Sequence, residues 1–298
     1  MGRVSAKRLL NKETMDDNQP DTAEPADDIF GEKLYQERAR MALPILVRQA
    51  HAQETMLYSA LAEELGMPNP RNLNFVLGSI GVTLLNLGEE WESSIPAIQN
   101  LVINKSSGIP SAGMGWLVSK EELKKLSLVQ KRNLASASLQ NVFAYSRWPE
   151  VLEALNLKPI GALAPFPSGN KVGGGEGEEH QKLKLLVAEN PVLVGLPKSA
   201  NKGEVEVTLS SGDKVDVLFR HKGLLIAVEV KSKISDDADL YRGLFQCVKY
   251  KAVLEKQLAV KGEPQNVRAI LYIDRDFPKS LIGVKNTLGS EVIRHEDA

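Results

Sequence analysis

Residues 203–233, GEVEVTLSSGDKVDVLFRHKGLLIAVEVKSK, constrain the fold more than any other segment. Three runs rich in β-branched residues are separated by turn residues at 210–212 and 221–223, which predicts a three-stranded meander. The last run is apolar enough for an interior strand, yet it contains Glu229 and ends at Lys231. A buried carboxylate is unfavourable unless it is paired or binds a metal, so these charges need a chemical reason.

Helical and strand patterns surround the meander. EEHQKLKLLVAENP precedes it as a helix, and DADLYRGLFQCVKYKAVLEKQLAV follows it as another. NVRAILYID then predicts a strand, FPKSLIGVKNTLG a helix and EVIRHE a last short strand. Residues 176–298 therefore predict an α/β domain with an αβββαβ core and a mixed sheet.

The half of the chain before this domain is mostly helical. Leu57, Leu61 and Leu65 recur at helical spacing before Gly66 and Pro68 end the helix. A second helix follows, so residues 31–157 contain the outline of a helix-turn-helix. The segment 95–118 predicts a strand, a turn and a second extended piece, which would form a wing. A helical interaction or dimerisation domain is the alternative.

Composition gives expectations for the segments outside these two domains and for the chain as a whole. Residues 1–30 are acidic and poor in aromatics, which predicts a disordered tail, and the glycine- and proline-rich residues 158–175 predict a linker. Cys247 is the one cysteine, so we expect no internal disulfide and a cytoplasmic location. No apolar run reaches the roughly 18 residues of a membrane span, so we expect no membrane contact. The net charge of -1 leaves only local patches for binding polyanions.

The charged residues of the meander converge on one predicted site. Side chains two apart on a strand share a face, so Glu229 and Lys231 point the same way. Asp216 lies on the preceding strand, and the hairpin can bring its carboxylate beside Glu229. Two carboxylates at a sheet edge suit Mg²⁺, and a nearby ammonium can orient a water and offset charge on a phosphate.

Asp216, a hairpin, and then Glu229-Val230-Lys231 resemble the PD-(D/E)xK, or restriction-endonuclease-like, nuclease superfamily. The resemblance spans residues 176–274, and Val215 stands where the motif begins with proline. In that superfamily the preceding helix often carries an acidic residue; Glu179 is favoured here, with Glu176 next. Gln246 and Tyr250, one helical turn apart, resemble the QxxxY motif of its RecB-like branch.

The resemblance implies a Mg²⁺-dependent endonuclease, with Mn²⁺ as a substitute ion and DNA as the favoured substrate, acting in restriction, defence or repair. The ion would be held by Asp216, Glu229, the carbonyl of Val230, and Glu179 or Glu176. Lys231 would position the attacking water, while Gln246 and Tyr250 would orient substrate or the lysine. Cutting both strands with one site per chain implies a homodimer.

The helix-turn-helix and wing segments, LYSALAEELGMPNPRNLNFVLGSI and IPAIQNLVINKSSGIPSAGMGWL, weakly resemble the winged-helix domain of alkylguanine-DNA alkyltransferases. In that family a reactive cysteine follows the proline of the second segment, whereas here Ala97 follows Pro96. Alkyl transfer is therefore not implied, and only the DNA-docking shape carries over. This leaves a competing function, a DNA-binding regulator or scaffold with a catalytically silent nuclease fold.

Each candidate residue also has a purely structural interpretation. Glu229 and Lys231 could form an ion pair on an exposed strand face, and Asp216 could be a turn residue. His180 is favoured as a packing residue over a ligand. Four cations near the site in sequence could contact phosphates or simply be surface residues: Lys233, Arg242, Lys249 and Lys251.

Overall fold

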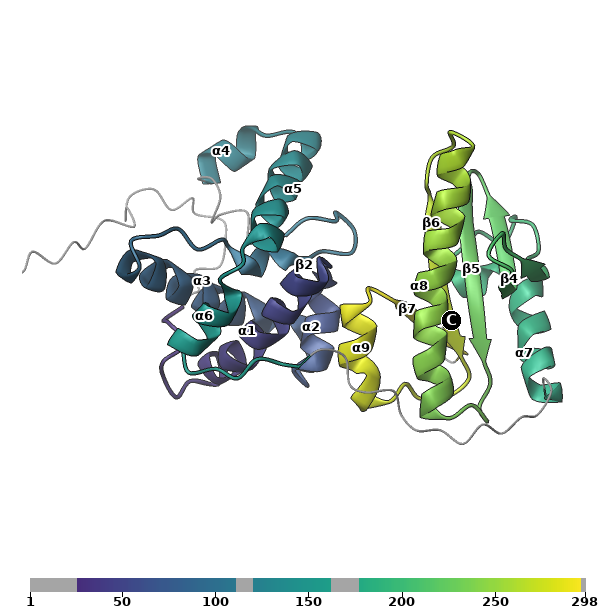
Figure 1. The fold of residues 1–298 in the computed structure, drawn as a ribbon, viewed down its shortest axis with the longest axis horizontal. Coiled ribbons are helices and arrows are strands. Elements are labelled where there is room, and N and C mark those ends of the chain that lie inside the picture. Colours follow the sequence, from purple (N-terminus) through teal and green to yellow (C-terminus); the bar gives the residue numbers. More distant parts are fainter. Residues whose placement is uncertain (1–25, 111–119, 162–176, 296–298) are drawn as a thin grey trace, which may run out of the picture.

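A computed structural model describes residues 26–110, 120–161 and 177–295 of the chain (Figure 1). A helical N-terminal domain and an α/β C-terminal domain lie side by side. Among the described residues no helix is long and apolar enough to cross a membrane.

The N-terminal domain packs three helices of similar length, α1, α3 and α5, with shorter helical segments between them. Its core centres on α1 and α3, where leucines and isoleucines such as Leu43, Leu46 and Ile80 are fully buried. Arg147 lies over the ring of Trp91, 4.4 Å from the ring centroid, and so ties the start of α6 to the end of α3. In chain order the elements are α1 (Leu34–Ala52), β1 (Met56–Leu57), α2 (Tyr58–Glu64), the 3₁₀ helix η1 (Pro70–Asn72), α3 (Leu73–Glu90), the 3₁₀ helix η2 (Ile98–Leu101), β2 (Val102–Ile103), α4 (Lys120–Lys125), α5 (Leu128–Ala144) and α6 (Trp148–Ala154).

The predicted helix pair is confirmed as α2 and α3, but the predicted wing is not formed as expected. Most of its first strand is η2, because Ile98 and Leu101 are both buried in the core, which a one-sided strand would not allow. Only β2 is extended, and it pairs in parallel with β1. The expected turn is present, where Asn104 accepts from the backbone N–H of Ser106. The second extended piece lies largely outside the described residues.

The predicted disordered tail, residues 1–30, extended too far toward the C-terminus. Ile29 is fully buried, and its backbone N–H donates to Thr83 Oγ1 at 2.9 Å. Arg40 donates to the carbonyls of Ile29 and Gly31. The ordered domain therefore begins before residue 31, while residues 1–25 of the predicted tail and residues 162–175 of the predicted linker lie outside the described residues.

The C-terminal domain has the predicted element order, helix, three strands, helix, strand, helix, strand. Its sheet runs β3-β4-β5-β6-β7, with antiparallel pairs as far as β5 and parallel pairs beyond it. The elements are α7 (Glu178–Glu189), the 3₁₀ helix η4 (Pro191–Val194), β3 (Glu204–Thr208), β4 (Lys214–His221), β5 (Leu224–Lys231), α8 (Asp237–Val260), β6 (Val267–Ile273), the 3₁₀ helix η5 (Lys279–Leu281), α9 (Ile282–Thr287) and β7 (Glu291–Arg294).

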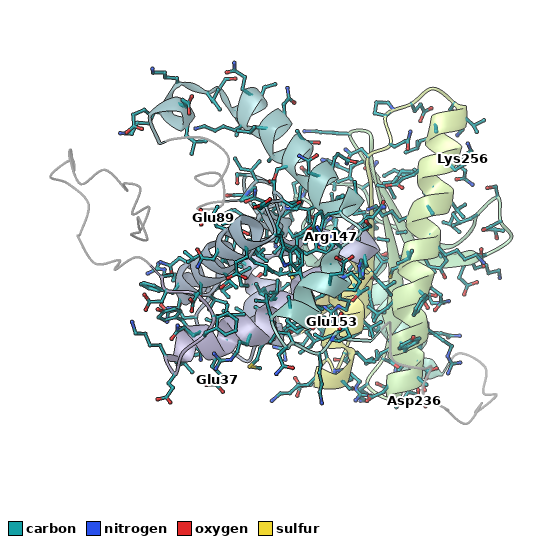
Figure 2. All side chains as sticks on the ribbon, turned by 60° about the vertical axis from the view of Figure 1, so that its left-hand side comes forward. Glu37, Glu89, Arg147, Glu153, Asp236 and Lys256 are labelled. Carbon is teal, nitrogen blue, oxygen red and sulfur yellow. The ribbon has the colours of Figure 1, made fainter. Side chains whose placement is uncertain are left out.

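Two helices cover opposite faces of the sheet. Ile226, Val228 and Val230 of β5 lie in the core beneath α7, whereas Leu225 and Ala227 pack beneath α8. Both faces of β5 are thus buried, which explains its nearly continuous apolar run. The helix α8 spans the sheet from the cap at Asp236 past the exposed Lys256 (Figure 2).

The short helix α9 joins the two domains. It belongs to the C-terminal domain by sequence but lies against α1 and α2 (Figure 1). Gln49 Nε2 donates to the backbone carbonyl of Asn286 at 2.9 Å, and Asn286 Nδ2 donates to Glu64 Oε2 at 2.8 Å. Lys285 adds an ion pair of 2.6 Å with Glu63. These contacts fix the C-terminal sheet relative to the N-terminal helices.

Candidate active site

The carboxylate of Glu229 lies inside the protein and is paired. Glu229 is 3% exposed, and its Oε1 lies 2.6 Å from Lys231 Nζ. The Lys231 side chain is 17% exposed, so its ammonium lies at the boundary of the buried region. The alternative of an ion pair on an exposed strand face is therefore wrong, because a side chain this buried cannot belong to a solvated face.

Asp216 lies where β4 and β5 separate. The last residues paired between these strands are Val217 and Val228. Beyond that point the carboxylate of Asp216, at Oδ2, accepts a hydrogen bond of 2.8 Å from the backbone N–H of Val230. The Asp216 side chain thus accepts the hydrogen bond from β5 in place of a backbone carbonyl of β4. Its partner, Val230, lies between Glu229 and Lys231.

Helix α7 contributes a histidine and a lysine to the opposite side of Asp216. His180 Nε2 and Lys184 Nζ each lie 3.8 Å from Asp216 Oδ1. The two residues are four apart on the helix and therefore share a face. His180, which the sequence analysis favoured as a packing residue, is thus a neighbour of the candidate carboxylate.

The acidic residues predicted on α7 are placed differently. Glu179 is 48% exposed at its side chain and pairs with Lys233 at 3.1 Å. It turns toward solvent because His180 and Lys184 occupy the helix face beneath which Asp216 lies. Glu176 lies outside the described residues.

The predicted pair on α8 reaches the same site. The Tyr250 hydroxyl lies 2.9 Å from the carbonyl of Lys214 and 3.0 Å from Glu229 Oε2, and Gln246 Nε2 donates to it at 3.3 Å. A hydroxyl has a single proton, so it donates to only one of these oxygens at a time. A protonated Glu229 would resolve the competition by donating to the hydroxyl. The interpretation of Gln246 and Tyr250 as plain helix surface is wrong for Tyr250, which is buried.

The two carboxylates have opposite electrostatic environments. Burial raises the pKa of Glu229, the charge of Asp216 adds to that rise, and Lys231 only partly offsets it. Burial also opposes ionisation of Asp216, but the nearby His180 and the hydrogen bond from the Val230 N–H hold its pKa below the usual value. Burial and the charge of Glu229 raise the pKa of Tyr250, which keeps the phenol neutral. The mutual repulsion of Asp216 and Glu229, which contributes to the raised pKa of Glu229, is the feature of this pair that would favour a bound cation.

The side chains at this site supply only part of the ligands that a hard divalent ion needs. Within the described part of the chain no three His, Cys, Asp or Glu side chains are grouped as a ready metal site. Mg²⁺ nevertheless binds to one or two carboxylates and keeps several waters, which Asp216 and Glu229 can satisfy. A divalent ion between them would also remove the repulsion that raises the pKa of Glu229.

The cations proposed to contact phosphates each have an acidic neighbour in this structure. Lys249 pairs with Asp213 at 2.7 Å, and Arg242 pairs with Asp239 at 2.9 Å. Their role toward a polyanion remains a prediction. Comparison with protein-family models, curated proteins and solved structures finds no match for this chain.

Proposed function

We propose that this chain is a metal-dependent nuclease that hydrolyses phosphodiester bonds, with DNA as the favoured substrate. One observation carries the proposal: Asp216 binds the backbone N–H between Glu229 and Lys231, and those two side chains form a buried pair. A fortuitous motif on a strand surface would have no reason to bury a carboxylate at 3% exposure beside a second one.

The surrounding fold supports the same proposal. The element order α7-β3-β4-β5-α8-β6 matches the αβββαβ core expected for the PD-(D/E)xK superfamily. Tyr250 contacts Glu229 from α8, and Gln246 contacts Tyr250, which agrees with the QxxxY resemblance. We therefore interpret the C-terminal domain as a restriction-endonuclease-like core.

Asp216, Glu229 and the carbonyl of Val230 would hold the ion in this proposal. His180 replaces Glu179 as the favoured contribution from α7, because it lies 3.8 Å from Asp216 whereas Glu179 pairs with Lys233. A bound Mg²⁺ or Mn²⁺ would polarise the phosphate and lower the pKa of a water.

The protein side chains have separate tasks around that ion. Lys231 would orient the attacking water and offset the negative charge that develops on the phosphate. Its ammonium is positioned by Glu229 at 2.6 Å. Tyr250 fixes the second oxygen of Glu229, and Gln246 in turn contacts Tyr250, so this pair holds Glu229 in place.

The N-terminal domain remains a candidate for docking nucleic acid, but not through the second helix of its helix-turn-helix. Helix α3 contains no lysine or arginine and ends at Glu89 and Glu90, so it would repel phosphates. A group of exposed cations lies on α4 and α5 instead: Lys124, Lys125 and Arg132, with Lys131 half-buried beside them. The regulator alternative, in which this domain carries the function, would then depend on α4 and α5 for contacts with phosphates.

Nuclease assays of the purified protein test the proposal. Supercoiled, linear and single-stranded DNA and RNA are incubated with Mg²⁺, with Mn²⁺ or with EDTA. Asp216→Asn and Lys231→Met should abolish cutting, whereas Asp276→Asn and Lys256→Met, which change the same charges at exposed positions, should leave it intact. Cutting that persists in EDTA or in Lys231→Met would refute the assignment. Sedimentation during the assay tests the homodimer expected for double-strand cutting.

A further inference from the structure

Lys184 is a buried lysine that the proposed mechanism does not use. It is 2% exposed, and its Nζ lies 3.0 Å from Glu206 Oε1 and 3.8 Å from Asp216 Oδ1. An ammonium is rarely buried unless it is paired. Here it stands between two carboxylates, one of which belongs to the candidate active site.

The position of Glu206 is unusual for a strand residue. Its φ is 55°, in the left-handed region, although β3 continues on both sides of it. Its neighbours in β3 pair regularly, Val205 with Val217 and Val207 with Val215. Non-glycine residues adopt this conformation uncommonly, and it persists where surrounding contacts hold it. Glu206 contacts two lysines here, the buried Lys184 at 3.0 Å and the exposed Lys214 at 3.7 Å.

Charge links this pair to Asp216. The ammonium of Lys184 opposes any second cation that approaches Asp216, and the carboxylate of Glu206 neutralises part of that ammonium. Lys184 holds the pKa of Glu206 below its usual value, Lys214 adds to that effect, and the charge of Asp216 opposes it, so Lys184, Glu206 and Asp216 lie within electrostatic range of one another. Burial of Lys184 limits screening by solvent and so strengthens the effect.

We propose that Lys184 and Glu206 are positioning residues of opposite sign that set the affinity of the Asp216 site for a divalent cation. The inference rests on the proposed function, because it concerns the same site. Lys184 lowers the affinity for the ion, and Glu206 raises it by neutralising Lys184. A merely structural ion pair would behave differently, since losing either partner would disturb Asp216 in the same way.

Binding of Mn²⁺, followed by the electron paramagnetic resonance of the free ion, separates these cases without an activity assay. Lys184→Met should bind Mn²⁺ roughly fivefold more tightly than the wild type, and Glu206→Gln roughly fivefold more weakly. The double variant should lie near the wild type. Glu204→Gln is the matched control, because Glu204 lies on the same strand, is exposed and pairs with Arg220 away from Asp216; its affinity should not change.

Weaker binding in both single variants would overturn the inference and leave the proposed function intact. Should Lys184→Met fail to fold by circular dichroism, Glu206→Gln decides alone, since its side chain is 47% exposed and tolerates the change. Unchanged binding in Glu206→Gln then refutes the inference. Absence of Mn²⁺ binding and of cutting in the wild type would overturn the proposed function and this inference with it.

Discussion

Replacing Lys231 by methionine tests the buried ion pair independently of catalysis. The two charged atoms lie 2.6 Å apart, and Glu229 is 3% exposed. Their attraction is about 6 kcal/mol at an effective dielectric constant of about 20, before the cost of desolvation is subtracted. Removing one partner of a buried pair destabilises proteins by about 3–5 kcal/mol. Because Lys231 keeps some exposure, we expect a loss of about 3 kcal/mol at neutral pH.

The loss of stability caused by Lys231→Met should become larger as the pH rises. Burial already raises the pKa of Glu229 above the usual 4.5, and loss of Lys231 raises it further. A carboxyl whose pKa is raised in the folded state contributes stability below its unfolded pKa, and this contribution disappears as pH rises through the folded pKa. The destabilisation by Lys231→Met should therefore be small near pH 4.5 and increase as pH rises above it.

Urea unfolding followed by far-ultraviolet circular dichroism measures both effects. The three tryptophans lie at positions 91, 116 and 148, so their fluorescence reports the N-terminal part of the chain and serves as an internal reference. Lys256→Met, an exposed change on α8, is the control. A loss equal to that of the control, or one that does not change with pH, would refute the buried-pair argument.

Three further perturbations test other contacts. Tyr250→Phe removes the hydroxyl between the Lys214 carbonyl and Glu229, and should destabilise the C-terminal domain by about 1–3 kcal/mol in the same urea experiment; no change would mean that the hydroxyl contacts are not formed. Asn286→Ala removes the donor to Glu64 between the domains, and calorimetry should resolve two unfolding transitions that move further apart; an unaltered thermogram would contradict this coupling. Ile29→Ala empties a fully buried position and should cost about 2–4 kcal/mol by tryptophan fluorescence, whereas a truly disordered tail would show no effect.

Much of the C-terminal domain could be predicted because its signals are local. Runs rich in β-branched residues, separated by turn residues, specified β3, β4 and β5, and helical periodicity specified α7 and α8. The same locality explains why the common face of Glu229 and Lys231 was predictable: two residues apart on a strand, they have no other arrangement. Gln246 and Tyr250 follow the equivalent rule for a helix.

The predictions that failed depended on partners distant in sequence. The segment around η2 has strand-like composition, but burial of Ile98 and Leu101 together favours a tight helical turn over a one-sided strand. Burial of Ile29 against α1 and α3 was likewise missed, because the acidic stretch before it favoured a disordered tail that included it.

The sequence by itself determined which charged residues stand on the strands and helices of the C-terminal domain, because side-chain periodicity follows from backbone geometry alone. Only the tertiary structure decided what faces Asp216. The separation of β4 from β5 aims its carboxylate at the Val230 N–H, and the rotation of α7 turns His180 and Lys184 toward it and Glu179 away. That rotation is set by how Leu183 and Val187 pack on the sheet, a contact between residues far apart in the chain.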